Sequence, residues 1–415
     1  MRRTLTISAL IACSLSLRAW TQTAGRPSTA IQPAASYADF GPVINPTLAP
    51  YNAKCDGSGD PKDSDALQAA INAAQNSSAP VLFIPNGANC AFDKTLSVAG
   101  NLTVLGATSQ FGAMLGSVLT YTGSGDAIQV GSPGKYSYYV SFENLNFVAT
   151  NRANSLIHFY GMNGPATVAN NIFSGGWSGT SALVYDLPAA GIQTVISNNY
   201  FMGFQGDEVI LHGYDNVEIN ANQFFAARGA GLYLSNPGVV EVHNNYFELM
   251  PTAIEVANDD ENHFKVNIHD NKIRNSNYPG TGSDPASDPP YSSSQRCILV
   301  RSTSDNLPFY GEGTIRDNEC TLSVLLSSGF IQGSAPYGIE FATRSNRFYV
   351  NQIWEVENNS IDGVAIAGIH NDNSKVVIHL MDNPAVKVWT PGSNPPVYLP
   401  SSRGPGRFTL PLPSE

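Results

Sequence analysis

The sequence is poor in charge, and basic residues are scarcer than acidic ones. Charged side chains make up 13% of the 415 residues, with 22 Lys and Arg against 33 Asp and Glu. An acidic chain without a basic run is a poor partner for a phosphate backbone, so we expect no nucleic-acid binding. Cys-x-x-Cys and His-x-x-x-His spacings are also missing, and the sequence therefore predicts no metal site of the zinc type.

Long apolar runs are missing beyond the start of the chain, and we expect no membrane span. Arginines precede an apolar stretch from Leu5 to Leu17, which Arg18 then interrupts. This pattern predicts a secretory signal peptide over residues 1–24, and hence a secreted protein, extracellular or periplasmic. Whether Cys13 carries a lipid anchor stays open.

Cysteine is scarce, with five residues in the whole chain. Removal of the signal peptide would leave Cys55, Cys90, Cys297 and Cys320. An even number in an exported chain favours disulfides over free thiols.

Glycine and proline are frequent, with 37 and 27 residues, which favours short strands and many turns over a helical bundle. One helix is nevertheless expected. Asp63, Ser64 and Asp65 are suited to cap its N-terminus, and one apolar face follows, made of Leu67, Ala70, Ile71 and Ala74. We divide the chain into a linker (25–50), an N-terminal cap (51–98), a repeat region (99–390) and a Pro-rich C-terminal tail (391–415).

The repeat is found by aligning segments on one asparagine, at a period of about 23 residues. The aligned positions are Asn171, Asn199, Asn222, Asn245, Asn271, Asn318, Asn359 and Asn383. Three positions earlier every residue is aliphatic, and two positions later every residue is apolar. A coil that stacks on its neighbours in register explains these columns, since one coil cannot bury its own apolar face. We therefore predict an all-β fold, a single-stranded right-handed parallel β-helix with a short N-terminal capping α-helix.

The segment Tyr51-Asn52-Ala53-Lys54-Cys55-Asp56-Gly57, with its helix and the strand from Val81, resembles the N-terminal cap of the pectate-lyase-like β-helix superfamily. That cap carries a tyrosine-glycine-alanine-lysine-glycine-aspartate-glycine stretch, so Cys55 replaces a frequent glycine. The resemblance implies the β-helix fold and a polysaccharide groove along it. It also implies that Cys55 pairs with Cys90, because the family packs these segments together. A pairing of Cys297 with Cys320 stays open.

We expect the groove along the strands that follow each Asn segment, for example Leu156–Phe159 and Glu208–Leu211. Strand alternation places the aliphatic and Phe side chains inside and four other side chains outside. These outward residues are His158, Glu208, Tyr233 and Glu255, and Asp207, His212, Arg228, Arg296 and Arg301 lie at strand ends. We predict Asp207, Glu208 and Arg228 as catalytic residues, and the other six as substrate-binding residues.

The segment Gly206-Asp207-Glu208 resembles the glycine-aspartate-aspartate motif of polygalacturonases, and two groove carboxylates would suit an inverting glycosidase. The other signatures of that family are missing: Gly229-Ala230-Gly231 stands where a His-Gly pair is expected. The alternative is a turn-forming Asp207 beside a solvated Glu208. In a lyase, Arg228 would pair with a uronate carboxylate or act as base, with calcium as a possible cofactor. Asp259–Glu261 could bind calcium or form a solvated turn.

The sequence thus predicts a protein that acts on a polysaccharide, an acidic one in our interpretation, by β-elimination or hydrolysis. The alternative is a non-catalytic β-helix that binds carbohydrate or serves at the cell surface. An insertion at 275–294, with Tyr278 and Tyr291, should project beside the groove or form a disordered loop. The sugar, the endo or exo mode of action and the oligomeric state stay open.

Overall fold

The computed structural model places most of the repeat region and the cap. The described residues are 43–58, 62–109, 116–133, 135, 137–162, 164–186, 193–213, 215–258, 264–277, 295–302, 310–326, 329–332, 335–343, 351–371, 376–383, 387–389, 397–398 and 408–409. The predicted signal peptide, Cys13, Asp259–Glu261, Tyr278 and Tyr291 lie outside these residues.

The strands form three sheets, which we call A, B and C. Sheet A contains β1 (Val81–Ile84), β4 (Leu102–Gly106), β7 (Val140–Glu143), β10 (Ala166–Ala169), β13 (Thr194–Ser197), β16 (Val217–Asn220), β19 (Val239–His243), β22 (Phe264–His269), β25 (Tyr310–Arg316), β29 (Asn351–Glu357), β32 (Val376–Met381) and β35 (Phe408–Thr409). Sheet B contains β2 (Asn89–Phe92), β5 (Val118–Tyr121), β8 (Asn146–Ala149), β11 (Ile172–Ser174), β14 (Tyr200–Met202), β17 (Gln223–Phe225), β20 (Tyr246–Glu248), β23 (Lys272–Asn277), β26 (Glu319–Leu326), β27 (Gly329–Gln332) and β30 (Ser360–Asp362). Sheet C contains β3 (Leu96–Val98), β6 (Asp126–Val130), β9 (Ser155–Phe159), β12 (Ser181–Tyr185), β15 (Val209–His212), β18 (Ala230–Ser235), β21 (Thr252–Asn258), β24 (Arg296–Ser302), β28 (Ala335–Thr343), β31 (Val364–Asn371), β33 (Lys387–Trp389) and β34 (Val397–Tyr398).

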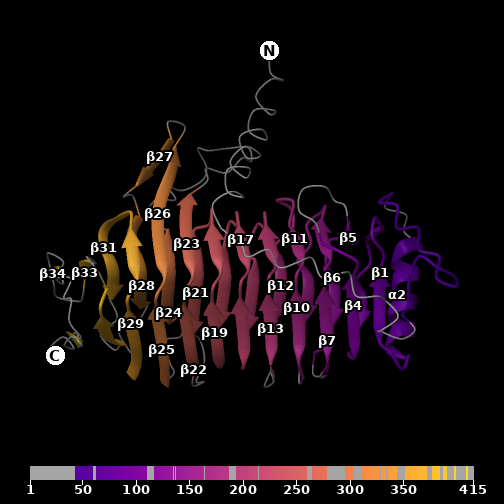
Figure 1. Ribbon diagram of the computed structural model, residues 1–415, viewed down its shortest axis with the longest axis horizontal. Coiled ribbons are helices and arrows are strands. Elements are labelled where there is room, and N and C mark those ends of the chain that lie inside the picture. The colour runs from indigo at the N-terminus through magenta and orange to yellow at the C-terminus, as the bar shows by residue number, and fades with distance from the viewer. Residues whose placement is uncertain are drawn as a thin grey trace, which may run out of the picture. The chain divides into compact units, whose positions relative to one another are not determined.

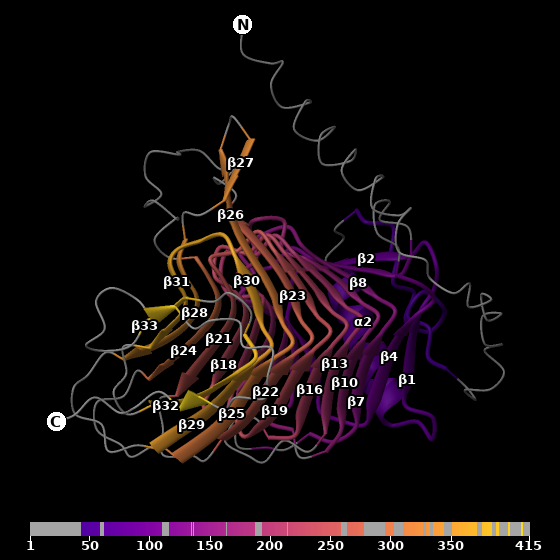
Figure 2. The same cartoon turned by 60° about the vertical axis from the view of Figure 1, so that its left-hand side comes forward.

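From β1 to β26 each coil contributes one strand to each sheet in the order A, B, C, so hydrogen-bonded neighbours are three strands apart along the chain (Figure 1). Beyond β26 the added strand β27 changes this spacing. Figure 2 shows the three sheets as separate faces of the stacked coils. The pairings are parallel except at β26–β27, β32–β35 and β33–β34, as far as the described residues go. The predicted right-handed parallel β-helix is confirmed.

The predicted columns form the interior. Val168, Ile196, Ile219 and Val242 pair in register in sheet A and are fully buried. In sheet B the rings of Phe173 and its neighbours on adjacent coils stack 4.6–5.0 Å apart. Identical side chains repeat because each coil offers its neighbour the same surface, at the inter-strand spacing of about 4.8 Å.

The asparagine column forms a continuous ladder at the turn between sheets A and B. From Asn171 to Asn383 each side-chain amide donates to the carboxamide oxygen of the next asparagine, at 2.9–3.3 Å. Most also donate to a backbone carbonyl of the preceding coil, as Asn222 does to Ile196 at 2.8 Å. The ladder therefore satisfies buried turn backbone.

The capping helix is α2 (Lys62–Gln75), and it covers the first coil. Leu67, Ala70, Ile71 and Ala74 are buried as predicted. The predicted N-cap is wrong, because the helix begins at Lys62 and Asp63 lies inside its first turn. The carboxylate of Asp63 instead accepts hydrogen bonds from the backbone amides of Lys54 and Cys55, and so ties the helix to the preceding segment. The predicted disulfide between Cys55 and Cys90 is confirmed, and Cys297 also pairs with Cys320.

Candidate functional site

The outward side chains of sheet C form one surface, which we call the sheet C face. Two columns build it in register. The central column includes Gln129, His158, Val184, Ile210, Tyr233, Glu255, Leu299, Glu340 and His370. The column toward the strand ends includes Tyr160, Asp186, His212 and Arg301. Five of the six predicted substrate-binding residues belong to these columns, and the sixth, Arg296, begins β24.

His158 lies at the centre of a charged network that joins three coils. Its Nδ1 lies 2.9 Å from Oδ2 of Asp126, and its Nε2 lies 2.9 Å from Oδ2 of Asp186. A carboxylate only accepts hydrogen bonds, so both contacts together require an imidazolium that donates from both nitrogens. The hydroxyls of Ser155 and Tyr160 also donate to Asp126, at 2.8 and 3.1 Å.

Burial and charge oppose each other in this network. Burial alone would raise the pKa of Asp126, but hydrogen bonds from His158 and Ser155 lower it to about 2. For His158 burial acts in the opposite direction and lowers the pKa. The hydrogen bonds and negative charges of Asp126 and Asp186 outweigh this effect of burial, so the pKa of His158 is raised. Asp126 is therefore a fixed anion that holds His158 in its charged form.

Asp186 is the open end of this network. Its side chain is 44% exposed, whereas those of Asp126 and His158 are 9% and 12% exposed. While Oδ2 of Asp186 contacts His158, Oδ1 faces Nε2 of His212 at 3.8 Å. That distance exceeds a hydrogen bond, and the His212 side chain is 42% exposed. The two groups can thus exchange protons with a molecule bound at the surface.

A second charged group lies further along the sheet C face. Arg301 donates to Glu255 at 2.5 Å, and Arg296 donates to Glu340, which His370 also approaches at 3.5 Å. The guanidinium of Arg296 also lies over the ring of Tyr337, 5.1 Å from its centroid. Both predicted arginines of this face are therefore compensated by carboxylates.

The prediction that Glu208 faces outward is wrong. Its side chain is fully buried, and burial raises its pKa well above the usual range. The amides of both Ala182 and Leu183 donate to the Glu208 carbonyl, at 2.9 and 3.2 Å, so the chain bends at the corner before β15 and simple alternation fails there. On the next coil the same position is Gly231, whose added Cβ would lie 2.9 Å from the interior ring of Phe247.

Within the described part of the chain, no hydrogen bond or ion pair joins Asp207 to Arg228. Asp207 accepts a hydrogen bond from the backbone amide of Ala230 at 2.6 Å, which agrees with the turn-forming alternative. Burial raises the pKa of Asp207, against the effect of Ala230 and the charges of Arg301 and His212. Arg228 is exposed. The catalytic roles of Asp207, Glu208 and Arg228 stay predictions.

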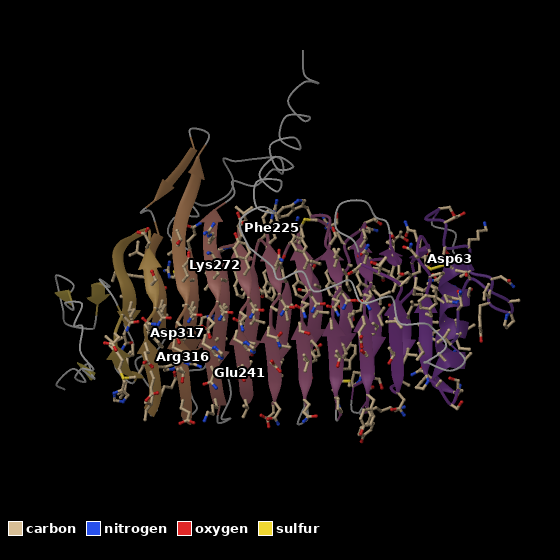
Figure 3. All side chains as sticks on the ribbon, in the orientation of Figure 1. Asp63, Phe225, Glu241, Lys272, Arg316 and Asp317 are labelled. Carbon is tan, nitrogen blue, oxygen red and sulfur yellow. A yellow bond between two sulfur atoms is a disulfide. The ribbon has the colours of Figure 1, made fainter. Side chains whose placement is uncertain are left out.

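The other faces also carry polar groups. On sheet A, His269 contacts Glu241 and Asp270, at 3.0 and 2.7 Å, and stacks on His243 at 5.0 Å. Figure 3 shows Glu241 on sheet A and Phe225 and Lys272 on sheet B. On sheet C, the pKa of His158 is raised and that of Asp126 is lowered, and perturbed pKa values of this kind are frequent at functional sites.

Sequence reasoning missed Asp126, Tyr160 and Asp186. A signal for Asp186 was available: it comes directly after β12, at the position that His212, the last residue of β15, occupies one coil later. Across the described residues, His, Cys, Asp and Glu side chains nowhere gather in a way that could hold a metal ion. Within the same part of the chain, none of the helices has the length and apolar character that a membrane crossing needs.

Comparisons with known proteins agree with the architecture. Residues 134–313 match the family model described as "Right handed beta helix region". No curated protein matches. Among solved structures, DFA-IIIase from Arthrobacter chlorophenolicus A6 is similar, with a TM-score of 0.52, 14% identity and coverage of 83% of this chain and 95% of that chain. Its lidless form in complex with GF2 gives 0.51 and 13% identity, with the same two coverages. The chain therefore has the right-handed parallel β-helix fold that the sequence resemblance implied.

Proposed function

We propose that the protein is a carbohydrate-active enzyme that cleaves a polysaccharide on the sheet C face. The observation that carries this proposal is the exposed Asp186 carboxylate, oriented by His158 and facing His212 on the next coil. The similar fold of DFA-IIIase, a carbohydrate-processing enzyme, supports the substrate class. The two disulfides support a site of action outside the cytoplasm.

Hydrolysis fits the face better than β-elimination. Elimination needs a cation to neutralise the uronate carboxylate, and Arg296 and Arg301 already contact Glu340 and Glu255. In the hydrolysis that we propose, Asp186 takes a proton from water as the water oxygen bonds to the anomeric carbon. Protonated His212 gives its proton to the leaving oxygen as the glycosidic bond breaks. Its side chain must first turn away from Asp186, because acid and base lie about 6.5–9.5 Å apart when water attacks directly, whereas these two groups are 3.8 Å apart without substrate. His158 acts as a positioning residue that holds Asp186.

The test is a screen of neutral and uronate polysaccharides that follows reducing ends and the absorbance of unsaturated products in parallel. On a substrate so found, Asp186→Asn and His212→Asn should each lower kcat/KM by about 100-fold or more. Glu218→Gln is the matched control, because it alters a half-exposed carboxylate beside a histidine on sheet A. Full activity of both sheet C variants, with loss in Asp207→Asn and Arg228→Ala, would move the site to the residues predicted from sequence.

A second candidate is a non-catalytic carbohydrate-binding protein. The observation that favours it is the internal compensation of charge on the sheet C face, where His158, Arg296 and Arg301 all contact carboxylates. Binding of a polysaccharide without release of any product, by either readout, would establish this function instead.

A further inference from the structure

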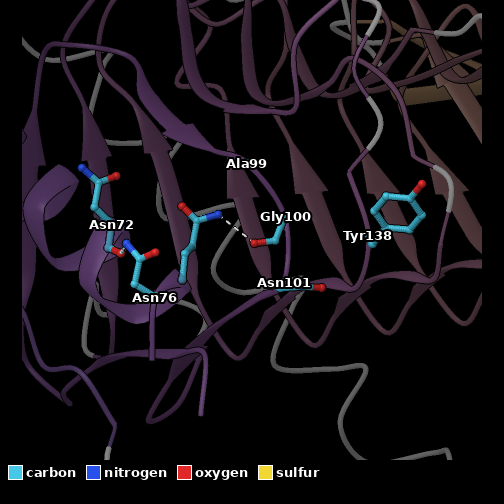
Figure 4. A pocket seen from close by; sticks show the side chains of 7 residues that line it. Asn72, Asn76, Ala99, Gly100, Asn101 and Tyr138 are labelled. Atoms are coloured by element: carbon cyan, nitrogen blue, oxygen red, sulfur yellow. Dashed lines mark hydrogen bonds between the residues drawn. The ribbon is translucent and has the colours of Figure 1, made fainter. Parts of the chain in front are cut away.

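A cavity of about 510 Å³ lies where the capping helix meets the first turns between sheets C and A (Figure 4). The last turn of α2 and the residue after it form one side, with the amides of Asn72 and Asn76. Tyr138 forms the other side, with Gly100 and Asn101 between them. None of these residues belongs to the sheet C face.

The described lining of this cavity carries no charged side chain and is rich in carboxamides. Some amide atoms fix the frame: Gln75 Nε2 donates to the Gly100 carbonyl, and Asn76 Nδ2 donates to that of Asn72, both at 2.7 Å. The Oε1 of Gln75, the Oδ1 of Asn76 and the Nδ2 of Asn72 contact no hydrogen-bond partner among the described residues. The lining therefore keeps two acceptors and a donor for a ligand.

Anions are disfavoured here. The cavity lies at the C-terminal end of α2, where backbone carbonyls and the helix dipole carry partial negative charge, and the last turn holds no basic residue. Cations are not favoured either, since no carboxylate lines the described surface. An uncharged ligand with hydroxyl groups satisfies both conditions, because hydroxyls both donate to and accept from carboxamides.

The cavity is preformed and has an aromatic wall. Tyr138 is 42% exposed, so part of its side chain is accessible to the apolar C–H groups of a ligand. The amide of Asn101 donates to the Tyr138 carbonyl at 2.6 Å, and Gly100 has a φ of +140°. A Cβ on Gly100 would lie 3.2 Å from the Tyr138 backbone nitrogen, so glycine allows the two turns to approach closely. Amide groups beside an exposed aromatic ring suit a sugar, because its hydroxyl groups at the ring edge are polar and its C–H groups above and below the ring are apolar.

We propose that this cavity binds a neutral saccharide unit, at a site separate from the sheet C face. The proposal does not depend on catalysis at Asp186, and it holds for an enzyme and for a non-catalytic binder alike. It assigns the hydroxyl contacts to Asn72, Gln75 and Asn76, and the stacking contact to Tyr138.

The test is calorimetric titration of the full chain with neutral gluco-, fructo-, xylo- and manno-oligosaccharides, and with oligogalacturonate as the charged comparison. At least one neutral series should bind, Tyr138→Ala should weaken its affinity about tenfold, and Tyr138→Phe should retain it. Tyr139→Ala is the matched control, because Tyr139 is the next residue, is 65% exposed and does not line the cavity. Its melting temperature and affinity should match the wild type.

Three results would overturn the proposal: no neutral series binds, Tyr138→Ala binds as the folded wild type does, or oligogalacturonate competes for the same site. Asp186→Asn separates this proposal from the catalytic one. That variant should bind neutral oligosaccharide with unchanged affinity even where all turnover is lost, and a parallel loss of affinity would show that the bound sugar lies on the sheet C face.

Discussion

Removal of one ladder amide, in the substitution Asn222→Ala, should be among the most damaging changes in the chain. The Asn222 Oδ1 accepts from the backbone and side-chain amides of Asn199 at 2.9 and 3.0 Å. Its Nδ2 donates to the Ile196 carbonyl and to Asn245 Oδ1 at 2.8 and 3.0 Å. Four buried hydrogen bonds at about 1 kcal/mol each give a loss of roughly 4 kcal/mol, and the partners left without water add to it. Asn222 is 1% exposed, so water cannot easily replace the amide.

The assay is urea unfolding combined with amide hydrogen exchange, since a stack of coils can lose its cooperativity locally. Exchange should accelerate most in β14, β17 and β20, the strands next to the altered turn. Gln223→Ala is the control on the neighbouring exposed position, and it should cost less than about 0.5 kcal/mol. Equal stability of the two variants would refute the ladder as a source of stability.

Three further predictions follow from charge, burial and covalent linkage. Because the pKa of Asp126 falls from 3.8 to about 2 on folding, its contribution of about 1–2 kcal/mol is complete above pH 4 and is lost as the pH falls toward 2. The raised pKa of His158 gives a contribution that is complete below pH 6.5 and is lost as the pH rises through its folded value, so stability should decline at both ends of the pH range. The acid decline should be shallower in Asp126→Asn, where Glu340, whose pKa is also lowered, keeps part of it, and a decline as steep as in the wild type would contradict this. Glu208→Met should stabilise the protein at pH 7 by roughly 1–3 kcal/mol in denaturant unfolding. A buried carboxyl with a raised pKa lowers the free energy of unfolding increasingly as the pH rises above 4.5, and the methionine removes this loss. A variant less stable than the wild type would contradict the absence of a hydrogen-bond partner for the Glu208 carboxyl among the described residues. Replacement of Cys55 and Cys90 by alanine should cost roughly 3–4 kcal/mol, and non-reducing peptide mapping of the wild type should recover them linked.

The fold could be predicted because its physical cause repeats in the sequence. A coil must offer the same surface at each step, so Asn222 and the aliphatic residues three positions before each ladder asparagine recur at one phase. The outward positions of His158, Tyr233 and Glu255 followed from strand alternation once that phase was known. These predictions rest on regular strand geometry, where the period of two holds.

The site could be predicted only in part, because its geometry departs from that regularity. Glu208 lies at a corner, where one carbonyl accepts two successive amides and two adjacent side chains face inward. Asp186 belongs to a coil that is longer than most, since Asn171 and Asn199 are 28 residues apart. A repeat of about 23 residues therefore does not predict the position of Asp186 on the sheet. Asp126 precedes Asn171, the first ladder asparagine, and so lies outside the repeat that the aligned asparagines define.

The stacking of coils explains how Asp126, His158 and Asp186, which are far apart in the sequence, come into contact. Neighbouring coils are about 4.8 Å apart, which brings side chains of adjacent strands within hydrogen-bond reach. Asp126 begins β6, His158 lies near the end of β9, and Asp186 follows β12, so the network crosses sheet C diagonally over three coils. A diagonal places the buried anion and the exposed carboxylate on opposite sides of one imidazolium. The buried end of the network can therefore fix His158, while the exposed end at Asp186 remains accessible from the sheet C face.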